Sequence, residues 1–429
     1  MTEQVQTEIL KCSKCGKCRS VCPVFVEVKT EGMVARGRIA LAEALLRGDM
    51  ADTAKMRQYL YGCLKCLRCA DGCPSAVRFD LIISAARAKL GKRVGLPWFA
   101  GLSMRLVTPR RRLFDLSVKA VSAFQKVLPR RAQGKVRHLP MMFFDGRNIP
   151  EVARRSVLNS FADYYGSKDA QRKVALFLGC LVNYAYPEVA EAMIKVLTHL
   201  GFGVYVPKGQ GCCGTPAMSL GDEALARRLA EANAVAFRGL GVEAIICGCA
   251  SGGATLKKEY PALLADAGDG CATATDGKTK AGDACVAPTG DRMPLGAQVY
   301  DFSEFVAPLI KDMPRRAIAI SWHDPCHLKF VQKIDRQPRE ILKKVADYKE
   351  FEGADYCCGM GGVFSAFFPE LSARIAARKT DALKNAADTL ATGCAGCMMQ
   401  LRDRVTAAGG KTEVVHIAQI IAKAIEEKK

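Results

Sequence analysis

The sequence has no segment that marks an exported or membrane-spanning protein. Its first residues, MTEQVQTEIL, have no basic start, no apolar core and no small-residue cleavage site, so we expect no secretory signal. No uninterrupted apolar run approaches the ~18 residues that cross a bilayer, so we expect no transmembrane helix. Both absences favour the cytoplasm, where a reducing environment keeps cysteines as thiols.

Acidic residues are scarce in one part of the chain. Overall, 63 Lys and Arg stand against 43 Asp and Glu, but between residues 91 and 144 twelve basic residues accompany one acid, Asp115. Large apolar residues lie among them at near-helical spacing: Trp98, Phe99, Leu106, Phe114, Leu116 and Phe124. Residues 91–170 are predicted to form a basic, largely helical linker that docks on an anionic membrane or a partner subunit; a solvated helix is the alternative. No recognition motif supports a nucleic-acid partner.

Cysteine, in contrast, is abundant, with twenty residues in a chain of 429. A reducing compartment disfavours disulfides, and a chain of this length with 49% hydrophobic residues can bury a core without them. The cysteines therefore predict metal ligation.

Two N-terminal runs, CSKCGKCRSVCP and CLKCLRCADGCP, share the spacing C-x2-C-x2-C-x3-C-P. This pattern is typical of bacterial ferredoxins, in which three cysteines of each run hold one [4Fe–4S] cube and the fourth reaches the other cube. The first cluster is thereby assigned to Cys12, Cys15, Cys18 and Cys73. The second is assigned to Cys63, Cys66, Cys69 and Cys22. We expect residues 1–90 to be a helical ferredoxin-like domain with two [4Fe–4S] clusters rather than a pair of zinc sites.

Residues 171–300 and 301–429 look like one unit written twice. In each, an apolar strand run (KVALFLGCLV or AIAISWHDPC) reaches a cysteine and is followed by a helix, a vicinal cysteine pair, another helix and a second strand. Such alternation predicts α/β units with mainly parallel sheets, whose ligands gather at the carboxyl ends of the strands. The predicted fold class is α+β multidomain: a helical ferredoxin domain followed by two α/β repeats.

The two repeats carry the same cysteine frame, and one of them is incomplete. The second repeat reads C-x30-CC-x35-C-x2-C and supplies Cys326, Cys357, Cys358, Cys394 and Cys397. The first repeat supplies Cys180, Cys212, Cys213 and Cys249, with Cys247 two positions before the last of these. Gly252 stands where the fifth cysteine of the first repeat would be.

The repeats resemble the cysteine-rich CCG domain of heterodisulfide reductases and of the iron–sulfur subunits of glycolate oxidase, lactate dehydrogenase and anaerobic glycerol-3-phosphate dehydrogenase. The order of a two-cluster ferredoxin unit and two CCG repeats is most similar to the glycolate oxidase and lactate dehydrogenase subunits. The resemblance implies a noncubane [4Fe–4S] cluster on the five cysteines of the second repeat. Gly359, Gly361 and Gly362 would then let the backbone approach it.

The first repeat leaves three alternatives open, because metal sites depend on ligand number and geometry. It holds no metal, or a smaller site (zinc or a cluster) in which Cys247 substitutes, or a second noncubane cluster with a replaced ligand. Cys271 and Cys285 fall in a Gly- and Ala-rich segment, residues 265–296, and are expected to be solvent-facing thiols in a surface loop.

By this resemblance the chain is the electron-transfer subunit of a membrane-associated lactate or glycolate dehydrogenase. A partner FAD-containing subunit oxidises the substrate, and a quinone or other respiratory acceptor receives the electrons. No G-x-G-x-x-G follows a strand, so no flavin is expected on this chain. The alternatives are a heterodisulfide reductase-like catalytic subunit and a zinc-binding scaffold. We expect a cytoplasmic location, peripheral on the inner face of the membrane.

Three residues beside Cys326 complete the candidates. His323 and His327 flank it and could donate hydrogen bonds to a cluster sulfur, with capping of local backbone as the alternative. Asp324 is expected to cap a helix, with a role as proton acceptor as the alternative.

Overall fold

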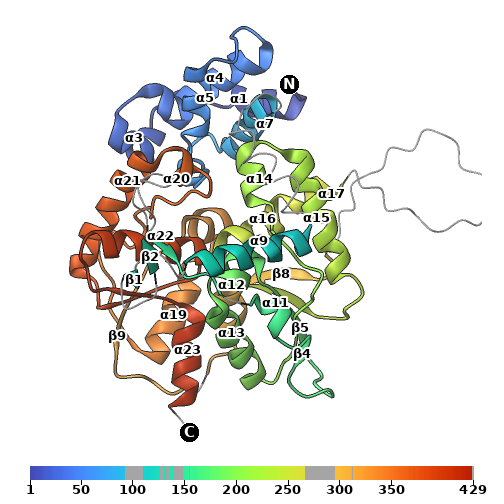
Figure 1. The fold of residues 1–429 in the computed structure, drawn as a ribbon. Coiled ribbons are helices and arrows are strands. Elements are labelled where there is room, and N and C mark those ends of the chain that lie inside the picture. Colours follow the sequence, from blue (N-terminus) through green and yellow to red (C-terminus); the bar gives the residue numbers. More distant parts are fainter. Residues whose placement is uncertain are drawn as a thin grey trace, which may run out of the picture.

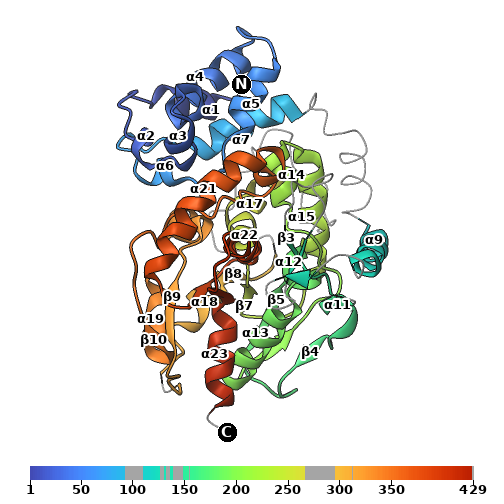
Figure 2. The ribbon, with the colours of Figure 1, turned by 60° about the vertical axis from the view of Figure 1, so that its left-hand side comes forward.

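The computed structural model describes residues 1–91, 110–125, 130–131, 136–138, 148–153, 155–265, 295–311 and 313–427. Cys271, Cys285, Trp98, Phe99 and Leu106 lie outside this part of the chain. The N-terminal residues form a helical part that sits on two α/β units lying side by side (Figure 1). A view turned by 60° shows the same arrangement, with α7 above α14 and α21 (Figure 2).

The N-terminal part is built from short helices around the two cysteine runs. Its elements are α1 (Glu3–Leu10), α2 (Cys18–Val21), α3 (Pro23–Val28), the 3-10 helix η1 (Glu31–Met33), α4 (Ala35–Arg47), α5 (Ala54–Tyr61), α6 (Arg68–Asp71) and α7 (Phe79–Gly91). Thr2 and Thr53 accept the N-terminal amides of α1 and α5 as side-chain caps. Helices α4, α5 and α7 bury Ile39, Leu60 and Ile82 against one another and hold the cysteine loops at one side.

The first α/β unit carries a five-stranded sheet of order β4-β6-β5-β7-β8, parallel except for the edge strand β4. Its strands are β4 (Tyr164–Tyr165), β5 (Lys173–Phe177), β6 (Gly203–Tyr205), β7 (Ala244–Cys247) and β8 (Gln298–Asp301). Its helices are α12 (Gly179–Tyr184), α13 (Pro187–His199), α14 (Thr215–Leu220), α15 (Glu223–Phe237), α16 (Ala250–Lys258), α17 (Tyr260–Leu264) and α18 (Phe302–Val306).

The second unit repeats this topology with a four-stranded parallel sheet of order β10-β9-β11-β12. Its strands are β9 (Ala319–Trp322), β10 (Asp347–Tyr348), β11 (Thr389–Thr392) and β12 (Glu413–His416). Its helical segments are the π-helix η3 (His327–Gln332), α19 (Arg336–Val345), α20 (Phe364–Phe367), α21 (Pro369–Ala382), η4 (Leu383–Asn385), α22 (Ala395–Ala407) and α23 (Ile417–Glu426). Equivalent strands hold equivalent places, so β6-β5-β7-β8 of the first unit matches β10-β9-β11-β12.

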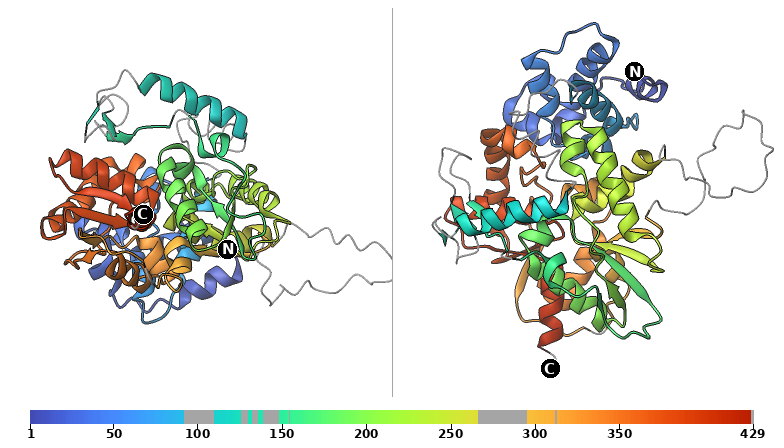
Figure 3. Two further views of the ribbon diagram at one scale, coloured as in Figure 1. Left: turned by 90° about the horizontal axis from the view of Figure 1, so that it is seen from below. Right: turned by 45° about the vertical axis from the view of Figure 1, so that its right-hand side comes forward.

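The two units pack as a pseudo-twofold pair, seen from below in Figure 3. Helix α13 of the first unit packs on α23 of the second, and the equivalent pair, α19 and α18, packs with the roles exchanged. Cys249 and Cys394 form an antiparallel bridge, and the Ala250 amide donates to the Gly393 carbonyl at 3.1 Å. A single apolar core runs through both units and includes Val174 and Leu390.

The basic region contributes one long helix and a small sheet. Helix α9 (Arg111–Phe124) lies along the first unit, and α11 (Val157–Ser160) precedes that unit's sheet. Strands β1 (Arg130–Arg131), β2 (Val136–His138) and β3 (Asn148–Pro150) form an antiparallel sheet that the sequence did not predict.

The N-terminal part is fastened to both units. Arg87, 2% exposed, donates to the carbonyls of Leu60, Tyr61 and Cys63 within its own part and to the Ser219 carbonyl of the first unit at 3.2 Å. Arg68 pairs with Asp355 of the second unit at 2.7 Å. The cysteine loops are thereby held against the strand ends of both units.

Candidate iron–sulfur sites

The two N-terminal cysteine loops have the same backbone shape. Lys14 and Gly16 in the first loop and Lys65 and Leu67 in the second take left-handed conformations at equivalent positions. Such a conformation is strained for a lysine or a leucine, so its repetition indicates that each loop must curl tightly around something. The Lys65 amide turns toward the Cys63 Sγ at 3.4 Å, as expected of a loop that surrounds thiolates.

The cysteines of the two runs surround two separate small cavities. The first, of about 40 Å³, is bordered by Cys12, Cys15, Cys18 and Cys73, and also by Cys69. The second, of about 20 Å³, is bordered by Cys22, Cys63, Cys66 and Cys69. Each cavity thus gathers three cysteines of one run and the last cysteine of the other. Four thiols with apolar neighbours such as Phe79 suit iron, which favours soft sulfur ligands.

The two N-terminal sites differ in their access to solvent. Cys15 is exposed, and the Lys17 amide lowers the pKa of its thiol. Cys66 faces the α/β units, and burial raises the pKa of its thiol to about 12. Metal binding must displace that proton, because thiolates are the ligands. One site therefore lies at the surface and the other in the interior.

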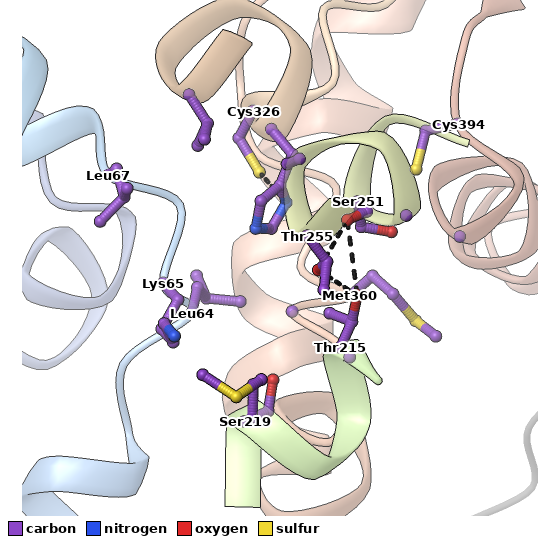
Figure 4. A pocket seen from close by; sticks show the side chains of 18 of the residues that line it. Leu64, Lys65, Leu67, Thr215, Ser219, Ser251, Thr255, Cys326, Met360 and Cys394 are labelled. Atoms are coloured by element: carbon purple, nitrogen blue, oxygen red, sulfur yellow. Dashed lines mark hydrogen bonds between the residues drawn. The ribbon is translucent and has the colours of Figure 1, made fainter. Parts of the chain in front are cut away.

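A cavity of about 900 Å³ lies where the N-terminal part and the two α/β units meet. Eight cysteines of the two repeats border it: Cys180, Cys213, Cys249, Cys326, Cys357, Cys358, Cys394 and Cys397. In Figure 4, Leu64, Lys65 and Leu67 enter from the second cysteine loop and face residues of both units. Both repeats place their cysteines near the carboxyl ends of their strands, as predicted, and these strand ends meet at the one cavity.

The second repeat brings all five of its predicted cysteines to this wall. The Sγ atoms of Cys358 and Cys397 lie 3.4 Å apart, and the Gly359 amide points at the Cys357 Sγ at 3.3 Å. Gly359 has φ +83°, and a Cβ there would lie 2.4 Å from the Ser372 carbonyl oxygen, so the turn after the vicinal pair requires glycine.

The histidines beside Cys326 take different positions. His323 is 1% exposed, and one of its ring nitrogens lies within 4.8 Å of the Sγ atoms of Cys358 and Cys397. Burial lowers its pKa, so the ring is neutral. His327 borders the cavity, with Nδ1 3.6 Å from the Cys326 Sγ. Both rings point toward sulfur rather than capping backbone.

Asp324 caps no helix, and that prediction is wrong. Its carboxylate is buried and accepts two hydrogen bonds from Arg339, each of 2.8 Å, and one from Trp322 Nε1. The arginine comes from the next helix, α19, and holds the pKa of the Asp324 carboxyl below its usual range despite burial. The residue anchors the turn that carries Cys326.

The first repeat assembles a smaller set of thiols. Cys180, Cys212 and Cys213 lie together, and the hydrogen bond with Cys212 lowers the pKa of Cys213 to about 7. Cys249 instead turns to the other unit, with its Sγ 4.0 Å from that of Cys394. Cys247 is fully buried and does not border the cavity; its thiol approaches the Cys249 carbonyl at 3.4 Å.

Gly252 faces this group. A Cβ at Gly252 would lie 3.5 Å from the Cys247 Sγ and 3.9 Å from the Cys213 Cβ, distances of ordinary contact. The position therefore accepts a Cβ without a clash. Its identity, rather than crowding, leaves the frame incomplete.

Hydroxyl groups line the first repeat's side of the cavity, and the sequence did not reveal them. Thr215 Oγ1 lies 3.1 Å from the Cys213 Sγ, and Ser251 Oγ lies 3.3 Å from the Cys249 Sγ. Thr215 Oγ1 also lies 2.6 Å from Thr255 Oγ1 (Figure 4). Thr215 follows the vicinal pair after one glycine, at the place that Met360 holds in the second repeat. This difference between the repeats is the feature of the sequence from which the hydroxyl groups could have been predicted.

The second N-terminal site and the second repeat's site share an apolar contact. Cys22 and Cys66 pack with Cys357 around Leu64 and Phe364. A Cβ at Gly361, in the glycine turn after Cys358, would overlap the Leu64 side chain at 2.4 Å. The two cysteine sites are therefore neighbours that share one apolar cluster.

Comparisons with known proteins agree with this arrangement. The family described as "4Fe-4S dicluster domain" matches residues 8–77, and the family described as "Cysteine-rich domain" matches residues 174–257 and 320–402. The "Probable glycolate oxidase iron-sulfur subunit" of Bacillus subtilis is 28% identical over 440 residues, covering 98% of this chain and 95% of that protein. The "Glycolate oxidase iron-sulfur subunit" of Escherichia coli is 25% identical, covering 97% of this chain and 94% of that protein.

Two further proteins extend the comparison. A subunit of the CoM/CoB fumarate reductase of Methanothermobacter marburgensis is 27% identical, covering 97% of this chain and 72% of that protein. A solved structure of a hypothetical protein from Helicobacter pylori superposes with a TM-score of 0.53 at 9% identity, covering 100% of this chain and 74% of the other, which shows a shared fold alone.

These findings define the chain as an iron–sulfur subunit of an oxidoreductase, with a dicluster ferredoxin domain followed by two cysteine-rich domains. Over nearly its whole length it is similar to glycolate oxidase iron–sulfur subunits, in agreement with the resemblance, and the matched domains confirm the predicted fold class. Among the described helices, none combines the length and the apolar character needed to cross a bilayer.

Proposed function

We propose that this chain carries electrons from an FAD-containing subunit, which oxidises lactate or glycolate, to a quinone or another respiratory acceptor. The observation that carries the proposal is the contact of Cys22, Cys66 and Cys357 around Leu64, which makes neighbours of the interior N-terminal site and the second repeat's site. The glycolate oxidase subunits, which match nearly the whole chain, support the class of substrate.

The cofactors follow from the donor sets. The two N-terminal sets of four cysteines would hold two cubane [4Fe–4S] clusters, as assigned from the spacing, and the five cysteines of the second repeat would hold a noncubane [4Fe–4S] cluster. When bound, such clusters supply sites that accept and release single electrons. The chain's own residues position the sulfurs, exclude water around Leu64 and Phe364, and turn two histidines toward them.

The order of transfer follows from exposure and contact. Electrons would enter at the site of Cys12, Cys15, Cys18 and Cys73, where Cys15 reaches the surface. They would pass to the interior site of Cys22, Cys63, Cys66 and Cys69 and then to the second repeat.

The first repeat has a lesser role in this scheme. Cys249 faces Cys394 and Cys247 does not border the cavity, so the described thiols that remain together are Cys180, Cys212 and Cys213. Three thiols suit a small metal site better than a noncubane cluster, and we propose that this repeat holds at most such a site.

Reduction of the clusters by substrate tests the proposal. The holoprotein is mixed anaerobically with its flavoprotein subunit, and lactate or glycolate is added. We expect the cluster absorbance to bleach and the EPR spectrum of reduced clusters to appear. The Cys66→Ser variant should still be reduced at the surface site but should no longer reduce the second repeat's cluster. Bleaching that needs no flavoprotein would contradict the proposed division of labour.

A second function is favoured by one observation, the size of the central cavity. About 900 Å³ leaves room for a small molecule beside a cluster, as a heterodisulfide reductase-like catalytic subunit would need. If the reduced chain alone reduces an added disulfide, this alternative is favoured. If an added disulfide does not reoxidise the reduced clusters, the alternative is excluded.

We also propose domain boundaries and a cellular location for this chain. Residues 1–90 would be the two-cluster domain, 91–170 the basic docking region, and 171–300 and 301–429 the two CCG domains. The basic region would attach the complex peripherally to the cytoplasmic face of the membrane or to a membrane subunit.

A further inference from the structure

Helix α9 is fixed to the body of the protein by one face. On that face Tyr184 donates to Asp115 at 2.7 Å, and the rings of Phe114 and Tyr184 lie 4.9 Å apart. At the end of the helix, the Gln125 side chain donates to the Val152 carbonyl at 2.7 Å and accepts from the Val152 amide at 2.8 Å. These contacts determine which side of α9 faces outward.

The outward face of α9 is apolar. Leu113, Leu116, Val121 and Phe124 are all exposed, with Leu116 and Phe124 reaching 64% and 63%. They recur at i, i+3, i+8 and i+11, which is one stripe of a helix, with Ala120 inside it. Four of the nine exposed large hydrophobic residues of the described chain thus lie on this single helix.

The charge around the stripe has one sign. Arg112 and Lys119 stand seven residues apart on one edge of it, are exposed, and form no ion pair with any described residue. The only acid of the helix, Asp115, is turned inward by Tyr184 and by Asn159, which donates to it at 3.0 Å. The surface that α9 presents therefore combines apolar side chains with positive charge and has no carboxylate of its own.

We propose that the outward face of α9 docks on an anionic lipid surface, with its apolar side chains in the interface and Arg112 and Lys119 at the headgroups. Apolar and basic residues without acids complement a negatively charged bilayer, and long cationic side chains can extend to headgroups while the stripe is buried. Seen from the side and from below, α9 lies at the periphery of the molecule and not between the units (Figures 2 and 3). This inference makes the proposed membrane attachment more specific. It depends on that proposal only for the choice of a membrane as the binding surface.

Binding of the holoprotein to lipid vesicles tests this directly. The probes are vesicles of phosphatidylcholine alone and of phosphatidylcholine with roughly 30% phosphatidylglycerol, compared by flotation at low and high salt. We expect binding to the anionic vesicles only, weakened by salt. The double variant Leu116→Glu, Phe124→Glu should lower the partition coefficient by about tenfold or more, because it places two charges in the stripe.

Met50→Glu is the matched control, since Met50 is 48% exposed and lies in the N-terminal part, between α4 and α5. It should bind like the wild type, and all variants should keep the same melting temperature and iron content. Equal binding by the double variant, or no anionic binding by the wild type, would overturn the proposal. Loss of the flavoprotein complex or of a dimer, without a change in vesicle binding, would assign the face to a protein instead. Cluster reduction by substrate is unaffected by these results, so the two proposals fail separately.

Discussion

The two cysteine-rich repeats share a sheet order, a packing partner and a cavity, yet they build different walls. Three positions before its first cysteine the second repeat has His323, where the first has Phe177; at the last position it has Cys397, where the first has Gly252. The second repeat's wall carries five thiols and the imidazole of His327. The first repeat's wall carries the thiols of Cys180, Cys213 and Cys249 together with hydroxyl groups. Both repeats keep the sheet order and the helices that form the pseudo-twofold interface, whereas the residues at their strand ends differ.

The largest expected difference between the repeats is in iron content. Cys357→Ser with Cys358→Ser should remove ~4 irons per chain, those of one [4Fe–4S] cluster, because it takes two of five ligands. The equivalent change in the first repeat, Cys212→Ser with Cys213→Ser, should remove no iron and at most one zinc. Iron, zinc and acid-labile sulfide analysis measures both. Equal iron losses would mean that both repeats hold clusters, and our view of the first repeat would be wrong.

The contacts that attach the N-terminal part should differ in the opposite sense, with the larger loss of stability at the contact with the first unit. Arg87 is buried and satisfies carbonyls on both sides of the contact with the first unit, so Arg87→Met should lower the free energy of unfolding by about 3–5 kcal/mol. Arg68, which is partly exposed and pairs with Asp355 of the second unit, should lose about 1 kcal/mol as Arg68→Met. Chemical denaturation compares the two. A larger loss for Arg68 would reverse the comparison.

The acid response separates two equivalent helix caps. Asp301 caps α18 and His416 caps α23, and burial raises the pKa of Asp301 to about 6 and lowers that of His416 to about 4. From pH 7 to 5 the unfolded chain takes up the proton at His416 and the folded chain does not, so stability falls by about 2 kcal/mol. At Asp301 the folded chain takes up the proton, so stability rises by about 1 kcal/mol.

Replacing each cap by asparagine, which can still cap, should expose these opposing slopes. Asp301→Asn should make the melting temperature fall more steeply between pH 7 and 5 than in the wild type, and His416→Asn should flatten it. Thermal unfolding of both variants at the two pH values gives the comparison. Parallel curves for all three proteins would show that neither group titrates in this range.

The smallest expected effect is a gain. Gly252→Cys restores the fifth position of the first repeat, where the structure has room for a Cβ. It should raise the metal content of that repeat, and removing a glycine from helix α16 should add up to about 1 kcal/mol of stability. Gly252→Ala controls for the helix effect alone. Extra metal in the alanine variant would show that the gain does not come from the thiol.

Spacing was enough to predict the parts whose geometry is local or repeated. The ferredoxin runs predicted loops that the structure curls in the same way, and strand–helix alternation predicted the two parallel sheets. The expected crossing of Cys73 and Cys22 between runs matches the cavities that they border, and metal analysis of the corresponding serine variants will test the assignment.

Contacts between residues that are distant in the sequence could not be predicted. Asp324 meets an arginine fifteen residues away, and Cys249 meets Cys394 of the other repeat, so neither partner is encoded by a local pattern. Cys247 looks like a spare ligand in the sequence, but it does not border the cavity, and its thiol approaches the Cys249 carbonyl instead. The hydroxyls of Thr215 and Thr255 meet only because α14 and α16 pack together.

The bridge between Cys249 and Cys394 also bears on how the protein is made. The central cavity has walls from both units and from the N-terminal part, and the Ala250–Gly393 hydrogen bond closes them together. A chain synthesised from its N-terminus completes that enclosure only after Cys397 has left the ribosome. If the second repeat holds the proposed cluster, its iron would arrive after the two N-terminal sites can already be filled, and biogenesis would run in the same direction as the proposed flow of electrons.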